Sequence, residues 1–496
     1  MLSSSRPIRF LLNREPIEVA DLDPHTTVLD WLRLHRRRTG TKEGCAEGDC
    51  GACTVAVGEL HDGRVRYRAI NACIQLLPML DGRQLITVED LAQVSDRGEV
   101  LHPVQQAMVD QHGSQCGFCT PGFVMSLFTL YHQQDEAVSQ APDRDRIDQA
   151  IAGNLCRCTG YAPIVRAARQ AISGPPVDHF QREEAAIARQ LNLLDCRTPL
   201  SFEGAGRRYF APTRLEQLWR LLAQWPQARI IAGATDVGLW ITKQQRLFDT
   251  LVQVSEVAEL KQLQCSAADG PLQIGAAVFY TDAFDVLVRR YPAMRDLLLR
   301  LGAVQVRNAG TIGGNIANGS PIGDMPPILI ALDARLRLSS QEGRREIALE
   351  EYFIDYGRQD LLPGECVESV LLPAVDRTQQ IAVYKLSKRF DQDISALCGA
   401  FVLSLDHGRV SSIRICFGGM AATPLRARAT EAALLGQAWD PSSVAMARHA
   451  MADDYTPLSD WRGSAAYRLL AAQNLLQRFY LETHSGVAVR INSHHG

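Results

Sequence analysis

Eight of the 13 cysteines fall within the first 158 residues, and they form two groups. The first group has the spacing C-x4-C-x2-C…C around a glycine-rich loop: Cys45, Cys50, Cys53 and Cys73. Plant-type [2Fe–2S] proteins have this spacing, because two bridged irons need four thiolates and a tight loop supplies three of them. Structural zinc sites, the alternative, usually use two short cysteine pairs. The spacing therefore favours a [2Fe–2S] cluster over zinc.

Three glycines, Gly44, Gly48 and Gly51, flank or separate the cysteines of this loop. Glycine permits the backbone angles that a loop needs to wrap around a cluster. It also lets backbone N–H groups point at the sulfur atoms, and such hydrogen bonds tune a cluster's reduction potential. We therefore expect N–H···S hydrogen bonds within the loop.

The second group combines a C-x2-C pair with a C-x-C pair 36 residues later: Cys116, Cys119, Cys156 and Cys158. Both pairs shortly precede a helix that a proline is expected to open, at Pro121 and Pro163. The positive ends of two helix dipoles, together with Arg157, suit an anionic cluster. Zinc remains an alternative here, although C-x-C is an uncommon zinc motif. We expect a second [2Fe–2S] cluster.

An odd number of cysteines spread over a long chain argues against a disulfide framework. We expect the remaining, scattered cysteines to be small, buried apolar side chains: Cys196, Cys265, Cys366, Cys398 and Cys416.

The charge balance excludes some classes of partner. Lys and Arg number 52 and Asp and Glu 55, a formal net charge of -3. This argues against proteins that bind nucleic acids or membrane surfaces, which are usually basic. No apolar run reaches the roughly 18 residues of a membrane-spanning helix. The N-terminal MLSSSRPIRFLLN lacks the apolar core of a signal peptide. We expect a cytoplasmic protein that binds neither nucleic acids nor membranes.

The pattern of apolar residues predicts an α+β chain of several domains. Alternation over 8–12 and 17–19 predicts a hairpin, Thr27 to Asp30 resembles a capping box, and 54–57 predicts a strand. Residues 1–90 are therefore compatible with a plant-ferredoxin-like domain. Residues 91–172 predict a four-helix unit, with prolines in the first turn of helices and Gly153 as a stop.

Residues 173–199 contain Ser-Gly-Pro-Pro and predict a linker. Strands and helices alternate over 200–375. A last unit, 376–496, is expected to have strands near 381–386, 399–405 and 412–417, followed by helices.

Two segments rich in small residues suit a dinucleotide. The first is a strand and turn, Ile230 to Gly238, and the second runs from Arg307 to Asp324. The chain contains neither G-x-G-x-x-G nor G-x4-G-K-[ST], so a Rossmann fold or P-loop is not indicated. Each segment alone is typical of a tight turn, but consecutive small residues also expose N–H groups that bind anions. Following an iron–sulfur module, the pair favours FAD, because a flavin accepts single electrons and releases a hydride.

The order of these motifs resembles the molybdenum hydroxylase family, and most closely the small iron–sulfur/FAD subunit of two-chain bacterial xanthine dehydrogenases. The motifs are the two cysteine sets, the linker, Gly233-Ala-Thr-Asp236 and Gly310-Thr-Ile-Gly-Gly-Asn315. The resemblance extends from about Ile8 to about Gln477. It implies a β-grasp ferredoxin domain, a four-helix [2Fe–2S] domain, a PCMH-type FAD-binding domain and a C-terminal CO-dehydrogenase-flavoprotein-like α+β domain.

The resemblance also implies roles for individual residues. The two cysteine sets ligate one [2Fe–2S] cluster each, the second being nearer to the molybdenum. The expected FAD-binding residues are Ile231, Ala232, Gly233, Ala234, Thr235, Asp236, Val237, Thr311, Gly314, Asn315, Asn318, Asp324 and Lys385. A loop with Lys388, Arg389 and Asp393 is expected beside the flavin ring. Animal relatives have an aromatic residue where this chain has Leu301, and their R-R-E-D-D-I loop reads Lys-Arg-Phe-Asp-Gln-Asp-Ile here.

The resemblance implies a xanthine dehydrogenase whose molybdenum cofactor lies on a separate large subunit, in a dimer of two-chain units. That subunit converts hypoxanthine and xanthine to urate, and this chain passes the electrons through both clusters and FAD to NAD+. No residue of this chain is expected to perform acid–base catalysis. Alternatives are the equivalent subunit of an aldehyde or heterocycle hydroxylase, a free-standing NADH-oxidising reductase, and a non-enzymatic zinc-binding scaffold.

Overall fold

The computed structural model describes residues 5–95, 98–133, 142–173, 177–194, 198–486 and 489. The chain forms two compact units, and each is described by itself. The first unit contains residues 1–258 and 302–310, and the second contains 259–301 and 311–496.

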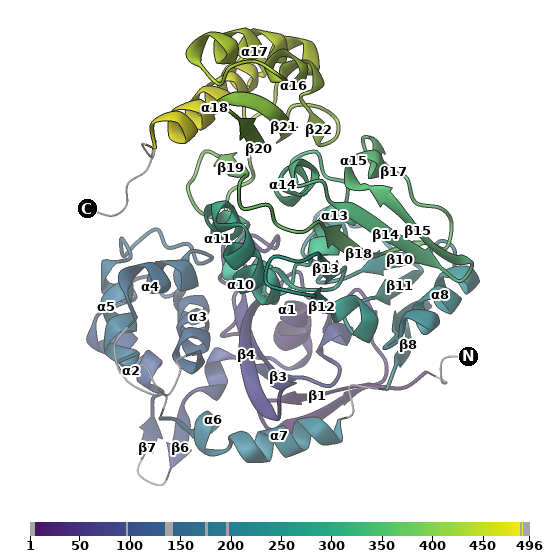
Figure 1. Cartoon of the computed structure of the whole chain (residues 1–496). Coiled ribbons are helices and arrows are strands. Elements are labelled where there is room, and N and C mark those ends of the chain that lie inside the picture. Colours follow the sequence, from purple (N-terminus) through teal and green to yellow (C-terminus); the bar gives the residue numbers. More distant parts are fainter. Residues whose placement is uncertain are drawn as a thin grey trace. The chain divides into compact units, whose positions relative to one another are not determined.

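The first unit begins with the predicted ferredoxin-like domain. Its sheet has the strand order β2-β1-β5-β3-β4 (Figure 1). The strands are β1 (Ile8–Leu12), β2 (Glu15–Val19), β3 (Thr54–His61), β4 (Arg64–Asn71) and β5 (Gln84–Ile86). The predicted hairpin is confirmed, because β1 pairs antiparallel with β2, and β1 also pairs parallel with β5. Alternation along β1 places Ile8, Phe10 and Leu12 in one buried cluster.

The predicted capping box opens the helix that packs on this sheet. Thr27 Oγ1 accepts a hydrogen bond from the backbone N–H of Asp30 at 3.0 Å, which starts α1 (Val28–Asp30). The helix continues through Trp31–His35. The Trp31 ring lies edge-on to Phe10, with 5.2 Å between ring centroids, so the helix covers the apolar face of β1.

The predicted helices follow. They are α2 (Pro103–Asp110), α3 (Thr120–His132), α4 (Arg144–Ile151) and α5 (Ala162–Ala171). Prolines occupy the first turns of α2, α3 and α5, where the missing N–H costs nothing. Along α3, Phe123, Leu127 and Leu130 are buried in the core of this group, as the apolar stripe predicts.

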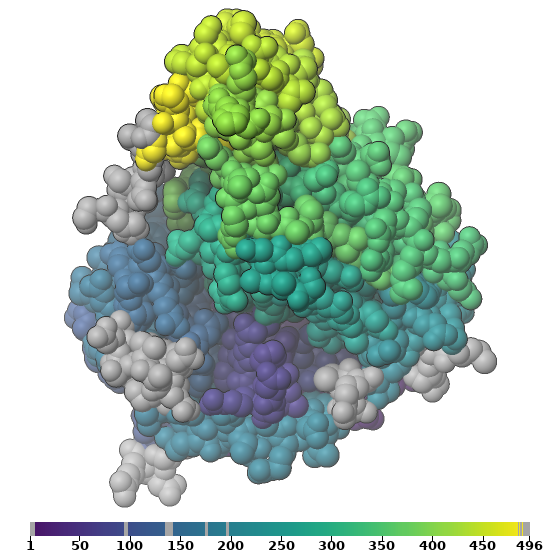
Figure 2. All heavy atoms as spheres, viewed as in Figure 1, coloured from purple at the N-terminus to yellow at the C-terminus, as the bar shows by residue number. Residues whose placement is uncertain are grey.

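The segment predicted as a linker contains two helices, α6 (His179–Arg182) and α7 (Glu184–Leu193), while Cys196 lies outside the described residues. Helix α7 packs on β3 and β4 and is visible on the surface of this unit (Figure 2). The Phe180 ring contacts both Tyr67 of β4 and Phe128 of α3, at centroid distances of 6.0 and 5.0 Å. This segment therefore holds the strand domain and the helical domain together.

A buried His–Asp–His cluster fixes the start of this segment. Asp178 Oδ2 lies 2.8 Å from Nε2 of both His102 and His132. These ligand atoms are close enough for a metal ion. However, His102 Nδ1 accepts a hydrogen bond from the N–H of Val104, so its proton is on Nε2 and faces Asp178. A protonated nitrogen cannot bind a metal, and the cluster is therefore a hydrogen-bonded tie.

The carboxylate and the buried imidazole of this cluster both make the folded chain less stable at low pH. Burial opposes ionisation of Asp178, but hydrogen bonds from His102 and His132 outweigh it and hold the pKa of the carboxyl below its ordinary range. Burial lowers the pKa of His102. In the folded chain His102 therefore resists protonation, and stability declines as the pH falls below about 6.5. The contribution of Asp178 is present above about pH 4 and is lost as the pH falls through its depressed pKa.

We expect Asp178→Asn to lower the free energy of unfolding at pH 7.5 by about 2 kcal/mol, because charge-assisted hydrogen bonds are lost. The difference from the wild type should shrink as the pH falls below about 4. Urea unfolding followed by tryptophan fluorescence measures both quantities. Asp62→Asn is the matched control, since Asp62 also neighbours a histidine but is 93% exposed. A difference that stays constant down to pH 3 would contradict the assignment.

A second sheet of this unit has the order β10-β11-β9-β8. Its strands are β8 (Leu200–Gly204), β9 (Arg207–Ala211), β10 (Arg229–Ile231) and β11 (Thr250–Gln253). Helix α8 (Leu215–Gln224) follows β9 in the chain and α9 (Val237–Thr242) follows β10, whereas α12 (Val304–Arg307) packs on β4 of the first sheet. Strand β10 confirms the strand predicted before the first segment of small residues.

The second unit contains a sheet with the order β12-β13-β18-β14-β15. Its strands are β12 (Leu263–Cys265), β13 (Leu272–Gly275), β14 (Arg335–Ser340), β15 (Gly343–Ala348) and β18 (Cys366–Leu372). Nearby helices are α10 (Tyr280–Arg290), α11 (Arg295–Arg300), α13 (Ile312–Ala317) and α14 (Met325–Ala331). Apolar residues of these strands and helices share one buried core.

The last part of the second unit is a sheet with the order β19-β20-β21-β22, and helices pack on it. The strands are β19 (Gln380–Leu386), β20 (Leu397–Asp406), β21 (Arg409–Gly418) and β22 (Leu425–Arg426). The helices are α16 (Arg428–Leu434), α17 (Pro441–Asp454) and α18 (Ala465–Ser485). The three predicted strands are confirmed, and so is the α+β fold class.

Of the four scattered cysteines that the structure describes, three follow the prediction. Cys366, Cys398 and Cys416 are buried, whereas Cys265 is exposed. Cys265 lies in β12, at the edge of its sheet, so the expectation of burial was wrong there. In the part of the chain that the structure describes, no helix has the length and apolar character needed to cross a bilayer.

Candidate functional site

The first four cysteines come together, all in the first unit. The Cys45 sulfur is hydrogen-bonded to both Cys50 and Cys73, which holds the pKa of the Cys45 thiol below its ordinary value. The same hydrogen bonds raise the pKa of Cys50 and Cys73, and Cys73 also contacts Cys53. Contacts between sulfur atoms thus join the three loop cysteines to the fourth, distant one. Four converging thiols are the donor set that a [2Fe–2S] cluster requires.

The predicted N–H···S hydrogen bonds are present in this loop. The backbone N–H groups of Glu47, Asp49 and Cys50 point at Cys45 Sγ, at 3.5, 3.3 and 3.3 Å. A Cβ on Gly44 would lie 2.7 Å from the Cys50 sulfur, so only glycine lets the loop close this tightly. Such hydrogen bonds stabilise negative charge on sulfur and therefore suit an anionic cluster.

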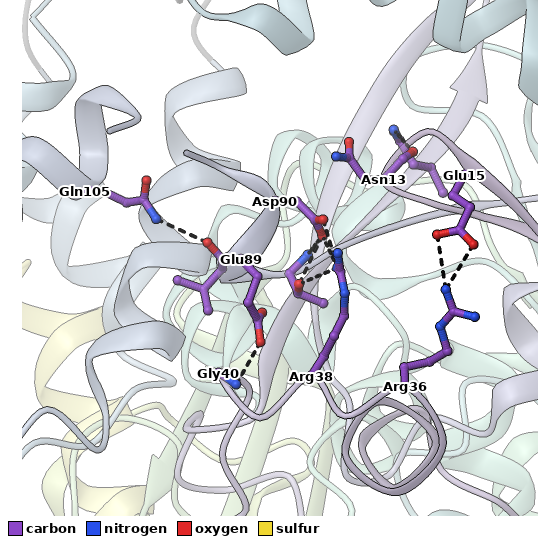
Figure 3. Close-up of polar contacts among 11 residues, drawn as sticks. Asn13, Glu15, Arg36, Arg38, Gly40, Glu89, Asp90 and Gln105 are labelled. Atoms are coloured by element: carbon purple, nitrogen blue, oxygen red, sulfur yellow. Dashed lines mark hydrogen bonds and ion pairs between the residues drawn. The ribbon is translucent and has the colours of Figure 1, made fainter. Parts of the chain in front are cut away.

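The start of the first cysteine loop is anchored by an acidic pair (Figure 3). Arg38 donates to the buried carboxylate of Asp90 at 2.8 Å, and the N–H of Gly40 donates to Glu89 at 2.8 Å. The side chain of Gln105, on α2, donates to the carbonyl of Val88 at 3.1 Å. The segment between the strand domain and the helical domain therefore fixes the first cysteine loop and α2 together.

The second four cysteines also come together in the first unit, in two contacting pairs. Burial and a hydrogen bond with Cys156 raise the pKa of the Cys119 thiol to about 12. Cys158 is hydrogen-bonded to Cys116, which raises its pKa. Cys116 and Cys158 are exposed, and Cys119 and Cys156 are half-buried. This set matches the first in donor type but lies at the surface.

Three glycines bring the two cysteine sets into backbone contact. A Cβ on Gly51 would lie 2.1 Å from the carbonyl oxygen of Gly153, and Gly51 has φ +68°. A Cβ on Gly122, in α3, would lie 2.2 Å from the carbonyl oxygen of Gly51. Gly51 follows Cys50 in the first loop, and Gly153 shortly precedes Cys156. We call this meeting of Gly51, Gly122 and Gly153 the glycine contact.

Hydrogen bonds cross the glycine contact. The N–H of Leu155, the residue before Cys156, donates to the carbonyl of Cys50 at 3.0 Å. This hydrogen bond joins a cysteine of the first set to the neighbour of a cysteine of the second set. The side chain of Asn154 donates to the carbonyl of Gly51 at 3.0 Å. The two cysteine sets are thus connected through main-chain groups, and their separation is fixed by the backbone.

We expect Gly51→Ala to destabilise the chain more than Gly63→Ala, by about 1–3 kcal/mol, because the added methyl group forces the cysteine loops apart. Gly63 is the matched control: its φ is +80°, but a Cβ there would meet nothing within 4 Å. Both variants share the cost of a left-handed alanine. Chemical unfolding and iron content report the difference. Equal effects in the two variants would show that the glycine contact is looser than the structure indicates.

The first segment of small residues, Ile231 to Val237, lies entirely in the first unit. Gly233 packs so closely that a Cβ would lie 1.7 Å from the carbonyl oxygen of Ala309, and Ala234 has φ +57°. Within the described part of the chain, the N–H groups of Gly233, Ala234 and Thr235 have no hydrogen-bond acceptor. Consecutive free N–H groups in such a turn suit a phosphate.

Helix α9, which follows this turn in the chain, contacts residues next to cysteines of the first set. Thr242 Oγ1 donates to the carbonyl of Ala46, next to Cys45, at 3.0 Å. A Cβ on Gly238 would lie 2.6 Å from the carbonyl oxygen of Ile74, next to Cys73. The expected phosphate-binding turn and the first cysteine set are therefore parts of one packed structure.

The other expected FAD-binding residues lie in the second unit. Thr311 caps α13 by accepting a hydrogen bond from the N–H of Gly314 at 2.9 Å. Asn315 Oδ1 is buried and has no partner among the described residues, as expected of an atom that awaits a ligand's donor. Asn318 ends α13. Lys385 Nζ donates to Asp324 Oδ2 at 2.5 Å, and both side chains are buried.

Residues around the expected flavin ring are placed as follows. Leu301 is buried in the core of the second unit. Lys388 donates to the carbonyl of Trp461 at 2.5 Å, and the N–H of Arg389 donates to Asp393 at 2.8 Å. The loop is thus held by one hydrogen bond to Trp461 and by one within the loop itself.

Sequence reasoning missed several polar residues of the site. Gln305, Asn154 and Ser126 form hydrogen bonds at the glycine contact, and His132 and Asp178 meet in the His–Asp–His cluster. These partners are separated by 28 to 179 positions in the chain. Only Asn154 carried a sequence signal, its place two residues before Cys156.

Four family models match successive segments of the chain. The "2Fe-2S iron-sulfur cluster binding domain" matches residues 10–76, and the "[2Fe-2S] binding domain" matches 87–169. The "FAD binding domain in molybdopterin dehydrogenase" matches 200–375, and the "CO dehydrogenase flavoprotein C-terminal domain" matches 382–483. The chain therefore carries two [2Fe–2S]-binding domains and an FAD-binding domain, and both cysteine sets belong to iron–sulfur rather than zinc domains.

Known proteins resemble the chain over most of its length. Xanthine dehydrogenase of Emericella nidulans is 31% identical over 97% of this chain, and aldehyde oxidase 4 of Cavia porcellus is 30% identical over 97%. The chain spans 39% of the length of each of these relatives. Carbon monoxide dehydrogenase from Hydrogenophaga pseudoflava has a solved chain that is 30% identical, with a TM-score of 0.52. The match covers 54% of this chain and 94% of that one.

Proposed function

Because the chain belongs to the molybdenum hydroxylase family, we propose that it is the electron-transfer subunit of a xanthine dehydrogenase. A separate large subunit carries the molybdenum cofactor and oxidises hypoxanthine and xanthine to urate. This chain conducts the electrons to NAD+. Bound [2Fe–2S] clusters supply one-electron transfer, and bound FAD supplies the exchange between single electrons and a hydride.

The observation that carries this proposal is the unbroken packing of the cofactor-binding segments in the first unit. The second cysteine set contacts the first through the hydrogen bond from Leu155 to Cys50. The first set contacts the turn at Gly233 through α9, by way of Thr242 and Ala46. Groups that transfer electrons must be held close together, and here each segment is anchored to the next.

Each set of residues has a holding role in this proposal. The first cluster is ligated by Cys45, Cys50, Cys53 and Cys73, and the second by Cys116, Cys119, Cys156 and Cys158. N–H groups of the turn from Ile231 to Val237 bind the FAD pyrophosphate. The other residues assigned to FAD binding lie in the second unit: Thr311, Gly314, Asn315, Asn318, Asp324 and Lys385.

The surface around the second cysteine set supports a partner subunit. Cys116 and Cys158 are exposed, and beside them in sequence Phe118 is 48% and Leu155 39% exposed. Exposed apolar side chains next to a redox site suit a protein partner that excludes water from it. We place the molybdenum subunit on this face, within a dimer of two-chain units.

The decisive experiment is an anaerobic NADH titration of the purified chain, loaded with iron, sulfide and FAD and followed by visible absorbance. Flavin and iron–sulfur absorbance should bleach together. Cys50→Ala and Cys158→Ala should each lose about half of the iron, because each disables one of two clusters. A chain that holds both cofactors but is not reduced by NADH has another acceptor, and a chain without iron overturns the proposal.

The buried pair of Lys385 and Asp324 offers a separate test of the FAD site. Lys385→Met leaves Asp324 buried without its cation. Removing one partner of a buried ion pair lowers the free energy of unfolding by about 3–5 kcal/mol. We expect lower FAD occupancy and unchanged iron content, because the cysteines lie in the other unit. Flavin released by denaturation and iron per chain are the two measurements. Lys261→Met, an exposed substitution in the same unit, is the control, and normal FAD occupancy in Lys385→Met would remove Lys385 from the site.

A second candidate is the equivalent subunit of an aldehyde or heterocycle hydroxylase. The similarity to aldehyde oxidase 4, at 30% identity, favours it nearly as much as the dehydrogenase match favours the first candidate. Substrate choice belongs to the molybdenum subunit, so the roles of residues in this chain are the same in both. Assaying the complex with xanthine, an aldehyde and an N-heterocycle separates the two.

A further inference from the structure

The side chain of Gln305 enters the glycine contact from the FAD-binding part of the sequence. Gln305 lies on α12, in the stretch 302–310 that belongs to the first unit although its neighbours in sequence belong to the second. Its side chain is almost completely buried, with 1% of the residue exposed. Gln305 therefore contacts the iron–sulfur domains through a buried side chain.

The Gln305 amide binds one residue from each of three segments around the cysteines. Its Nε2 lies 3.1 Å from Thr54 Oγ1, 3.2 Å from Ser126 Oγ and 3.2 Å from Asn154 Oδ1. Thr54 follows Cys53, Ser126 lies on α3 after Cys119, and Asn154 precedes Cys156 by two residues. One side chain thus connects both cysteine sets.

The three partners are themselves hydrogen-bonded across the glycine contact. Thr54 Oγ1 donates to the carbonyl of Gly51 at 2.6 Å, and Ser126 Oγ donates to Asn154 Oδ1 at 2.7 Å. Thr54, Ser126 and Asn154 are each 1% exposed. In such a dry network every hydrogen bond constrains the others, so Gln305 determines the geometry of the whole group.

The Gln305 side chain fits only beside a glycine, and it leaves its own carbonyl oxygen unpaired. A Cβ on Gly153 would lie 2.1 Å from Gln305 Oε1, so any other residue at 153 would displace the amide. In the described part of the chain, Gln305 Oε1 has no hydrogen-bond partner although it is buried. Leaving a buried carbonyl oxygen without a hydrogen bond is unfavourable. The amide is therefore poorly explained by stabilisation alone.

We propose that Gln305 is a positioning residue that sets the electronic coupling between the two iron–sulfur clusters. It does so by holding Thr54 and Asn154 together, which keeps the hydrogen bond from Leu155 to Cys50 short. Electron tunnelling weakens steeply when a hydrogen-bonded path opens into a gap. This inference rests on the proposed function, because it requires both cysteine sets to carry clusters.

The test compares Gln305→Met, which keeps the length of the side chain but removes its hydrogen bonds, with Asn308→Ala. Asn308 is the matched control: it is also buried on this segment, but it donates to the carbonyl of Ala69, on β4, at 2.9 Å. Both variants are prepared as full-length chains loaded with iron, sulfide and FAD. Iron content and the flavin spectrum confirm that the cofactors are present.

Three readouts are expected to change in Gln305→Met and not in Asn308→Ala. The magnetic splitting between the two reduced clusters in low-temperature electron paramagnetic resonance should diminish. Electron transfer between the clusters after flash reduction should be slower than in the wild type. Hydrogen exchange of the Leu155 amide, which needs no cofactor, should become faster.

If Gln305→Met fails to fold, Gln305→Asn is the second variant, because it retains the amide but withdraws it by one methylene. Unchanged splitting and unchanged transfer in a variant that holds both clusters would overturn this inference and leave the proposed function intact. Equal changes in Asn308→Ala would also overturn it, since the effect would then be general loosening of the segment. A wild-type chain without two clusters would overturn the proposed function and this inference together.

Discussion

The close approach of backbone atoms at Gly51, Gly122 and Gly153 is the constraint on which the first unit depends. Side chains normally keep two packed domains apart and allow them to adjust. Here carbonyl groups lie where side chains would be, so the separation of the two cysteine sets is fixed by main-chain geometry. Such a contact has little freedom to relax, because interiors are close-packed. An electron relay needs this kind of fixed spacing.

Three further segments contact both the strand domain and the helical domain. The segment with α6 and α7 packs Phe180 against both domains and is tied by Asp178. The residues around Asp90 anchor the start of the first cysteine loop and contact α2. Gln305 enters from the FAD-binding part of the sequence. The first two are connections between domains in the sequence, so connecting segments contribute to this rigidity, whereas Gln305 lies inside the FAD-binding domain.

The sequence alone could predict the features that depend on local chemistry. Cysteine spacing identifies the donor sets, proline marks the starts of α2, α3 and α5, and alternation identifies β1 and β2. The polar network around Gln305 could not be predicted, because its partners are up to 251 positions away and no periodicity encodes them. Cys265 shows the opposite error. Its small apolar side chain suggested burial, but it lies on an edge strand, and edge position is a property of the fold.

The boundary between the two units falls inside one sequence motif, and this has a functional consequence. The glycine- and asparagine-rich stretch beginning at Arg307 is continuous in sequence, yet residues up to Gly310 belong to the unit with the cysteines and residues from Thr311 belong to the other. In the proposed function, the first part of the motif supports the iron–sulfur domains and the second part holds FAD. Substitutions after Thr311 should therefore alter flavin binding more than substitutions before Gly310 do. A single motif thus joins the two halves of the relay by covalent continuity.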